Sequence, residues 1–507
     1  MADTLPTGLP STIHKDALTV SGASSHSKAL VERLLEQDRE SNHCFYGPGF
    51  HNHLSHHLLA AYDLGAPSSL IQAIYDEEKH GLNSVFTADR PNKTVERQNL
   101  HIGVDTWTHY LGQEKYYANY LEFFSDEVRR LGPKPAYQHY VFSEDANIGK
   151  AHMTERFVGG ALHPLIQMGY AIEFGSDVMI AQALAQTAVH EAFEPGLFPW
   201  SSESVDDGPA VDISANGQRA ATSKDEHTLL SILRETYRSD IMTPVLPYDP
   251  DALLSARRKA AFTPARVSEI RRLTMLWHLS AFATPAQLAQ KTEELFFVAA
   301  LLFAGVGRPG RKERLDFFLM HVLTSTVFVP NLVGALDGAT AQKRLLEAVL
   351  SVVLAYVLLR GRPRIDCELI MSYTASPRPD GAQLIPTPGA LGEPATKPDE
   401  YINPWPTLLA HVLPARDAHT LKALRTLYVG AQRYGTIPAG AVRGAVDSRG
   451  EETHAGAKRL DGSVFVRAAG ALVRVMGWVG PGEGGGQKEG SWDRSALGWD
   501  EAWDEED

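Results

Sequence analysis

The 507-residue sequence has only two cysteines, Cys44 and Cys367. This scarcity excludes a disulfide framework and a cysteine-built zinc site, and it is typical of proteins in a reducing compartment. The first residues contain no basic region followed by an apolar stretch, so we expect no signal peptide. The longest uncharged apolar run, residues 348–359, is too short to span a bilayer and predicts a buried core helix. We therefore expect a cytoplasmic protein without a membrane span.

Positive charge is also in deficit, because 48 basic residues face 61 acidic ones, a net charge of −13. Much of the imbalance lies in residues 481–507, which contain nine acidic and two basic side chains. The rest of the chain is mildly acidic, so we expect no nucleic-acid partner. Trp492, Trp499 and Trp503 interrupt the acidic segment. A solvated tail rarely needs three tryptophans, which predicts that residues 497–503 dock on the body while the last acids stay free.

The sequence lacks the motifs of the common nucleotide and hydrolase sites, and it shows no internal repeat. A G-x-G-x-x-G pattern at Gly305–Gly310 follows a long helical run rather than a strand, so we interpret it as a helix–helix loop. The basic residues beside it, Arg308 to Arg314, are interpreted as a solvated face rather than an anion site. No flavin-binding or nicotinamide-binding fold is therefore expected.

Helical spacing of apolar residues dominates, and alternation of period two occurs only near residues 463–475. We therefore expect a mainly α-helical, bundle-like protein with long loops and little or no β-structure. An irregular leader is predicted at 1–24, one large helical domain at 25–480, and the acidic tail at 481–507. A division into two packed lobes near 196–226 is the alternative. Long loops are expected at 196–225 and 374–404, and helices at 25–39, 113–131, 151–168, 176–192, 227–238, 263–282, 286–304, 311–329, 340–360, 405–413 and 416–434.

Four of the twenty histidines fall within seven residues, at 51–57. Asn52 is a suitable N-cap, and the apolar residues that follow have helical spacing. On that helix His53, His56 and His57 share one face. Such a face can simply be polar and hydrogen-bonded, but a catalytic or metal-binding face is the preferred interpretation.

Three other histidines, His163, His190 and His321, lie in separate apolar helical segments. Each alone is most simply a hydrogen-bonded core histidine. Together with the 51–57 segment they predict a site at the centre of a helical bundle. Imidazole is the commonest protein metal ligand and the usual general base near neutral pH, so both uses stay open.

Several segments resemble the questin oxidase-like family of fungal polyketide biosynthesis. They are NHLSHHLLAAYDLGA (52–66), GGALHPLIQMGYAIEF (159–174), DFFLMHVLTS (316–325), RGRP (360–363), LRTLYVGAQRYG (424–435) and LGWDEAW (497–503). They occur in order between about residues 25 and 503. The resemblance is specific as a set, although no single segment is a chemical motif.

The resemblance implies an enzyme that oxidises polycyclic aromatic polyketides, such as anthraquinone- or xanthone-like intermediates, and opens a ring. Some members act as Baeyer–Villiger-type monooxygenases without a flavin, and NADPH is the reductant implied for some of them. At least one relative resembles a non-heme iron dioxygenase, with iron held by four histidines and a carboxylated lysine. The expected partners are therefore an aromatic polyketide and dioxygen, and Fe(II) is the alternative cofactor.

Carried over to this chain, the resemblance implies His56, His57, His163, His190 and His321 as catalytic residues. If iron is bound, it implies His57, His163, His190 and His321 as ligands. We place the lysine of the iron site near the RGRP segment, which has arginines but no lysine, so the chain departs from the iron pattern there. Gln167 stands where many relatives have a histidine.

An electron-rich phenolate or hydroquinone can react with dioxygen directly when a protein deprotonates it and excludes water. A buried histidine suits the role of base. Aromatic walls suit a flat substrate, and an arginine near the carbonyl would stabilise an oxyanion. We expect the substrate contacts to be His53, Tyr116, Tyr120, Phe317, Phe318 and Arg360. The alternatives to Baeyer–Villiger-type oxygenation are an iron dioxygenase and a non-catalytic helical protein that shields a reactive intermediate.

Overall fold

The structure is a computed structural model, and it describes residues 8–47, 49–86, 100–200, 227–277, 284–379, 403–480 and 492–504. Most of the two long loops predicted at 196–225 and 374–404 lies outside the described residues. So do the first seven residues of the predicted leader and most of the acidic residues of the predicted tail.

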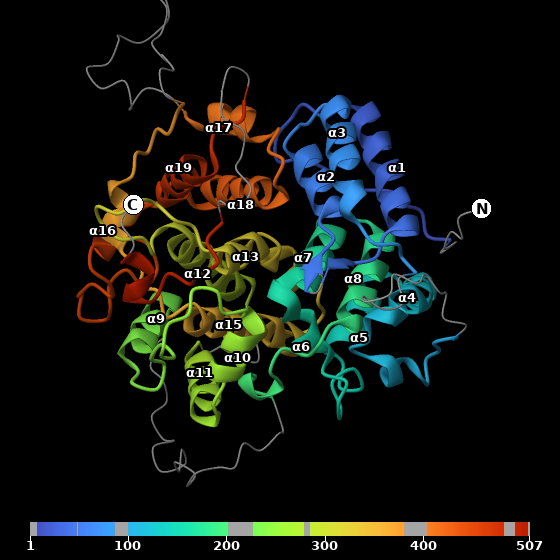
Figure 1. The fold of residues 1–507 in the computed structure, drawn as a ribbon, viewed down its shortest axis with the longest axis horizontal. Helices are drawn as coiled ribbons and strands as arrows, with labels where there is room; N and C mark the ends of the chain where they lie inside the picture. The colour runs from blue at the N-terminus through green and yellow to red at the C-terminus, as the bar shows by residue number, and fades with distance from the viewer. Residues whose placement is uncertain are drawn as a thin grey trace, which may run out of the picture. The chain divides into compact units, whose positions relative to one another are not determined.

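The prediction of a mainly α-helical fold is confirmed, because the described residues form nineteen α-helices and one two-stranded antiparallel sheet (Figure 1). The strands are β1 (Phe45–Gly47) and β2 (Phe50–His51), and the helices are α1 (Ser25–Ser41), α2 (Leu54–Asp63), α3 (Ser68–Glu78), α4 (Tyr117–Leu131), α5 (Pro133–Phe142), α6 (Met153–Phe157), α7 (Gly159–Phe174), α8 (Asp177–Val189), α9 (Leu229–Arg238), α10 (Leu254–Ala261), α11 (Pro264–Leu276), α12 (Pro285–Ala304), α13 (Phe317–Thr326), α14 (Val329–Gly334), α15 (Ala339–Leu359), α16 (Cys367–Ser372), α17 (Trp405–Val412), α18 (Ala418–Tyr434) and α19 (Val464–Met476).

The segment whose alternation allowed a strand, residues 463–475, is helix α19. Its buried residues include Phe465, Ala468, Ala469 and Leu472, which recur at spacings of three and four. Alternation over a short apolar run does not separate a strand from a buried helix, and here the helical period prevails.

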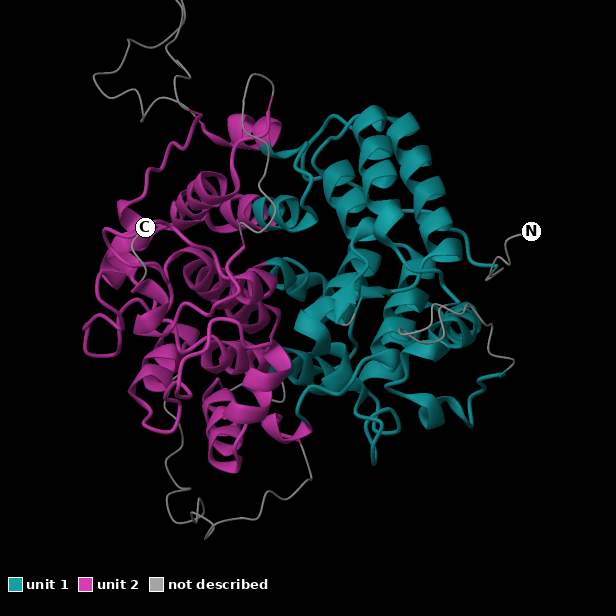
Figure 2. Ribbon diagram, viewed as in Figure 1, with its two compact units in different colours: residues 1–194, 324–348, 412–425 teal, residues 195–323, 349–411, 426–507 magenta. Residues whose placement is uncertain are grey.

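The chain divides into two compact units (Figure 2). Unit 1 comprises residues 1–194, 324–348 and 412–425, and unit 2 comprises residues 195–323, 349–411 and 426–507. The divisions fall inside α13, α15 and α18, among other places. Within the described residues, every helix is too short or too polar to cross a membrane.

Unit 1 is built around helices α7 and α8, whose surfaces are apolar on nearly all sides. All thirteen residues of α8 except Asp177 are buried, and α8 packs against both α4 and α7. Helices α1, α2 and α3 pack on one another. The short hairpin of β1 and β2, in which Phe45 pairs with His51, leads directly into α2 and so places the histidine-rich segment beside α7.

Unit 2 contains helix α12, which packs against α9 and α19. A capping box starts α12: Thr284 Oγ1 accepts the Gln287 N–H at 3.3 Å, and Gln287 Oε1 accepts the Thr284 N–H at 2.9 Å. Residues 497–503 pack in the same unit. Trp499 Nε1 donates to the Val245 carbonyl at 3.1 Å, and Trp499 and Trp503 are only 5% and 6% exposed.

Candidate functional site: a cluster of buried imidazoles

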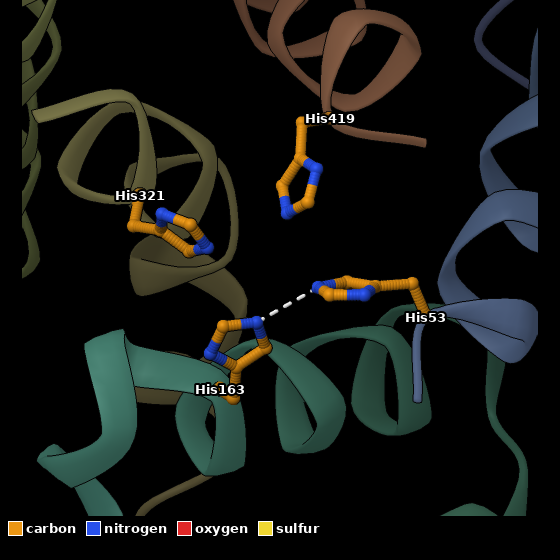
Figure 3. Close-up of side chains that lie close together, drawn as sticks. All are labelled: His53, His163, His321 and His419. Carbon is orange, nitrogen blue, oxygen red and sulfur yellow. Dashed lines mark hydrogen bonds between the residues drawn. The ribbon is translucent and has the colours of Figure 1, made fainter. Parts of the chain in front are cut away.

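Three histidines from three helical segments of unit 1 converge on one point. They are His53 just before α2, His163 on α7 and His419 on α18, and a ring nitrogen of each lies within 4.8 Å of the others (Figure 3). His53 Nε2 lies 2.9 Å from His163 Nε2, and the rings of His53 and His419 meet edge to face at 4.4 Å. Figure 3 also draws His321, which belongs to unit 2.

A hydrogen bond at the other ring nitrogen orients two of these three rings. His163 Nδ1 lies 2.5 Å from the Gly160 carbonyl oxygen, and His419 Nδ1 lies 2.9 Å from Asp417 Oδ1. Because both partners only accept, Nδ1 carries the proton in each ring and Nε2 is the basic nitrogen. Metal-ligating histidines commonly donate the N–H of their other ring nitrogen to a carbonyl or carboxylate in the same way.

The backbone before His163 has an unusual conformation that sets its ring. Gly160, Ala161 and Leu162 have φ of +52°, +54° and +64°, so three successive residues are left-handed within α7. For alanine and leucine this conformation costs roughly 1–2 kcal/mol each. The turn brings the Gly160 carbonyl to His163, and backbone outliers of this kind concentrate at functional sites.

A second pair of histidines lies directly against the first group. His51 stacks on His163 with ring centres 3.7 Å apart, and His51 Nε2 lies 2.7 Å from His190 Nε2. His190 Nδ1 donates to the Gln186 carbonyl at 2.7 Å, so His190 Nε2 accepts and His51 Nε2 donates. Burial, with Arg156 nearby, lowers the pKa of His190 to about 4 despite that carbonyl, so the ring is neutral at pH 7.

Gly160 is the point of closest approach between α7 and this pair. A Cβ atom there would lie 2.3 Å from His190 Nε2 and 3.0 Å from His51 Nε2. We expect Gly160→Ala to break the His51–His190 hydrogen bond, displace His163 and lower kcat at least about tenfold, since misplacing a positioned group is costly. Gly149→Ala is the matched control, because Gly149 has φ of +59° and open space around it. Equal rates in the two variants would contradict the assigned role of Gly160.

His56 lies deeper in unit 1, where it is fully buried. His56 Nε2 donates to Gln167 Oε1 at 2.7 Å, and the ring stacks on Tyr170. Gln167, one turn after His163 on α7, thus holds the tautomer of His56 with its side-chain oxygen. His56 Nδ1 is buried and has no hydrogen-bond partner among the described residues.

Lys422 on α18 supplies a buried positive charge to this group. Burial, opposed by Asp417 and Glu78, lowers the pKa of Lys422 to about 8. Burial, reinforced by the Lys422 ammonium, lowers the pKa values of His53 and His56 well below their usual range. The site therefore combines neutral imidazoles with an ammonium group whose pKa is close to neutral pH.

A surface pocket reaches two of the imidazoles. Its volume is about 230 Å³, and its walls include Tyr46, His53, Leu82, Arg416 and His419. Tyr46 and Phe50 of the hairpin contact each other, and both rings are exposed. The pocket thus offers a flat aromatic surface and an arginine next to His53 and His419.

Other residues predicted for the site have different surroundings. His57 Nδ1 bonds Glu78, and its Nε2 is buried without a partner among the described residues. Tyr116 contacts Tyr110, and Tyr120 is buried with its hydroxyl donating to the Trp107 carbonyl at 2.6 Å. None of these three side chains lines the pocket, whereas the predicted substrate contact His53 does.

The remaining predicted residues belong to unit 2. His321 on α13 is buried, and its Nδ1 donates to the Phe317 carbonyl at 2.8 Å. The Arg360 side chain is buried, forms an ion pair with Asp316 at 2.7 Å and lies over the Phe318 ring. Its Nη2 is buried without a hydrogen-bond partner among the described residues, and the role of Arg360 as a substrate contact stays a prediction.

Sequence reasoning missed His51 as a partner of His190, and it missed His419 and Lys422 entirely. The sequence prediction placed the lysine of the iron site near RGRP. In the structure, the lysine beside these imidazoles is Lys422, three residues after His419 on α18. The signal was the spacing His-x-x-Lys in a predicted helix, which puts both side chains on one face.

An ion network fixes the helices that carry the site. Arg425 Nε donates to Asp63, the last residue of α2, at 2.8 Å. Arg425 Nη2 donates to Glu173, near the end of α7. Lys15 bonds the same two carboxylates at 2.5 and 2.8 Å. Two cations and two anions thus tie α2, α7 and α18 together, about two turns after His56 and His419 and about three turns after His163.

The network makes unit 1 sensitive to acid. Burial alone would raise the pKa of Asp63, but Arg425 and Lys15 lower it to about 2. A lowered folded-state pKa gives stability that is present above the unfolded value near 4 and is lost as the pH falls toward 2, here about 2 kcal/mol. We expect the free energy of unfolding, followed by tryptophan fluorescence, to fall as the pH is lowered from about 4 toward 2. Asp63→Asn is expected to be less stable at neutral pH but to lose less stability over the same pH range. An equal dependence of stability on pH in the variant and the unmodified chain would contradict the assignment.

The fold and the site define a mainly helical protein with a buried multi-histidine centre. A family model for questin oxidase-like proteins matches residues 50–427. Relatives include a Baeyer–Villiger oxidase of Pestalotiopsis microspora (26% identity over 69% of this chain and 74% of the relative), oxidoreductase AflY of Aspergillus parasiticus (30%; 67% and 64%) and a questin oxidase of Aspergillus terreus (24%; 70% and 74%).

The chain belongs to the questin oxidase-like family, and it is an oxidoreductase. The matched segment, residues 50–427, begins at the β2 strand before His51 and ends just after Lys422 and Arg425. It therefore contains every histidine of the cluster and all of the ion network except Lys15.

Proposed function

We propose that the chain oxygenates an aromatic polyketide of the anthraquinone or xanthone type and opens one of its rings by flavin-independent Baeyer–Villiger-type chemistry. The observation that carries this proposal is the group of clustered imidazoles, with His53 held neutral by burial and by the nearby Lys422 ammonium, beside a pocket lined by His53, His419 and Tyr46. The names of the relatives, Baeyer–Villiger oxidase and questin oxidase, support the reaction type.

The residues of unit 1 suggest how such a reaction proceeds. A phenolic substrate enters along Tyr46, and His53, held neutral by burial, accepts its proton. The Lys422 ammonium and Arg416 lower the energy of the resulting anion. The electron-rich anion reacts with dioxygen, and the peroxide adds to a neighbouring carbonyl. One oxygen atom enters the ring and the other leaves as water, so two electrons come from a hydroquinone substrate or from a reductant such as NADPH.

A specific observation favours a second candidate, an iron dioxygenase. His163 and His419 direct basic Nε2 atoms toward His53, and each is oriented through Nδ1 as metal-ligating histidines are. The donor set fits a divalent metal that prefers imidazole. His53, His163 and His419 would hold it. Lys422, whose charge acts on His53, would correspond to the carboxylated lysine that the resemblance implies. Bound iron would supply oxygen activation. That His57, His190 or His321 also binds the metal stays a prediction.

An isotope experiment distinguishes the candidates. The protein is purified without chelators, its metal content is measured, and an anthraquinone is supplied under ¹⁸O₂ with and without a chelator. One labelled oxygen in the ring-opened product, unaffected by the chelator, supports the Baeyer–Villiger proposal. Two labelled oxygens with near-stoichiometric iron support the dioxygenase. An unchanged anthraquinone that is protected from oxidation would support the binding protein and contradict both.

A further inference from the structure

Unit 2 contains a large cavity that the histidine site does not use. Its volume is about 840 Å³, within the range of cavities that bind cofactor-sized ligands. Two glycine–arginine segments form part of its wall: Gly305–Gly310 after α12, and the RGRP segment at 360–363 after α15. Helix α9, residue 244, residues 453–455 and residues 497, 498 and 500 also line it.

The cavity carries positive charge in an acidic protein. Three acidic side chains line it, Asp366, Glu368 and Asp500, against five arginines: Arg234, Arg238, Arg308, Arg362 and Arg364. The whole chain has a net charge of −13, so the sign of this cavity is opposite to that of the molecule. A concave surface of one sign concentrates ligands of the other sign.

Several of these guanidinium groups retain hydrogen-bonding capacity. Arg364 is exposed and has no ion pair among the described residues, and its guanidinium lies over the Tyr237 ring. Arg362 donates to the Ser239 carbonyl at 2.9 Å and meets no carboxylate among the described residues. Arg234 pairs with Asp447 at 3.1 Å, but its Nε is buried without a partner in the described part of the chain.

The backbone places Arg362 at some cost. Gly361 has φ of +82°, and Arg362 has φ of +57°, a conformation that non-glycine residues seldom adopt. Trp499 covers Gly361 so closely that a Cβ there would lie 2.1 Å from its ring. The turn thus holds two arginines on the cavity wall, two residues apart, and neither forms an ion pair among the described residues. Such strain is retained where it positions functional groups.

His454 adds a polar atom that lacks a partner. Its ring packs edge to face on Tyr237, and His454 Nε2 is buried with no hydrogen bond among the described residues. Burial, with Arg234 and Arg238 nearby, lowers the pKa of His454 to about 4, so at neutral pH the ring is an uncharged hydrogen-bonding group. A buried polar atom without a partner is uncommon, and this one belongs to a side chain that lines the cavity.

We propose that this cavity binds a ligand carrying at least two phosphate groups, held by Arg362 and Arg364 on one wall and by Arg234 and Arg238 on another. Guanidinium groups bind phosphate through paired hydrogen bonds, and four of them lining one cavity from two elements suit two linked phosphates better than one carboxylate. Arg238 also forms a loose ion pair with Glu235 at 3.9 Å. The site is separate from the histidine cluster and does not depend on the proposed oxygenation.

Calorimetric titration of the full chain tests the proposal, with pyrophosphate, ADP and sulfate as probes. We expect the phosphate probes to bind with micromolar affinity and sulfate at least tenfold more weakly. ADP binding tenfold tighter than pyrophosphate would identify a nucleotide, and equal binding would identify the pyrophosphate group itself. Both results support the proposal. No binding at millimolar probe, or equal binding of sulfate, would overturn it.

Two variants locate the binding. Replacing both Arg362 and Arg364 by glutamine is expected to weaken pyrophosphate binding at least tenfold, while circular dichroism verifies the fold. Arg459→Gln is the matched control, because Arg459 is exposed in the same unit and does not line the cavity. An equal loss in the control would show non-specific attraction and overturn the proposal. His163→Ala is expected to bind pyrophosphate like the unmodified chain, which separates this site from the oxygenation site.

Discussion

His163→Ala is expected to lower kcat/KM for polyketide oxidation by about 10²–10⁴, the usual contribution of a positioned acid–base group. The variant removes the ring that stacks on His51, bonds His53 and is oriented by the Gly160 carbonyl. Oxygen uptake and product formation measure the loss. If the protein binds iron, the metal content of the same variant falls as well, and this change does not depend on turnover.

The control for this prediction is His109→Ala, since His109 is exposed on a short helical turn of the same unit. It is expected to keep the full rate. His163→Gln retains a polar group near the Nε2 position and tests whether hydrogen bonding alone suffices. Undiminished oxidation by His163→Ala would refute both enzymatic proposals and favour a protein that only shields its ligand.

Arg425→Met is expected to destabilise unit 1 by about 3–5 kcal/mol, because it leaves the buried Asp63 carboxylate and the partly buried Glu173 carboxylate with one cation. Asp63 is fully buried, and Arg425 also lies over the rings of Tyr170 and Phe328. Because Tyr170 stacks on His56, the substitution also disturbs the site. For a unit of this size the loss corresponds to a fall in melting temperature of roughly 10 °C.

Arg416→Met serves as the stability control, since the Arg416 side chain is 78% exposed and forms only a loose pair with Glu77. A surface pair of this kind contributes about 0–1 kcal/mol. The double variant Arg425→Met/Asp63→Asn is expected to cost less than the sum of the two single changes, because Asp63→Asn removes a buried charge that Arg425→Met leaves with Lys15 alone. Equal melting temperatures for Arg425→Met and Arg416→Met would contradict the role of the network.

The amino-acid sequence alone determined the helical class and the family resemblance, and it predicted that two segments, 51–57 and 159–174, contribute to the site. These are local properties: apolar spacing sets a helix, and histidines among large hydrophobes stand out wherever the chain places them. The same local patterns suggested His53, His163 and His190, and the structure places all three close to other imidazoles.

Only the tertiary structure decided which histidines share a site. His419 and Lys422 lie more than 250 residues after His163, and no periodicity links them; the packing of α18, fixed by Arg425 on Asp63 and Glu173, brings them together. Likewise, the left-handed turn before His163 depends on close contact between Gly160 and His190. Helix formation is governed by neighbours in sequence, whereas a site is assembled by contacts across long sequence separations, and those exist only once the core has packed.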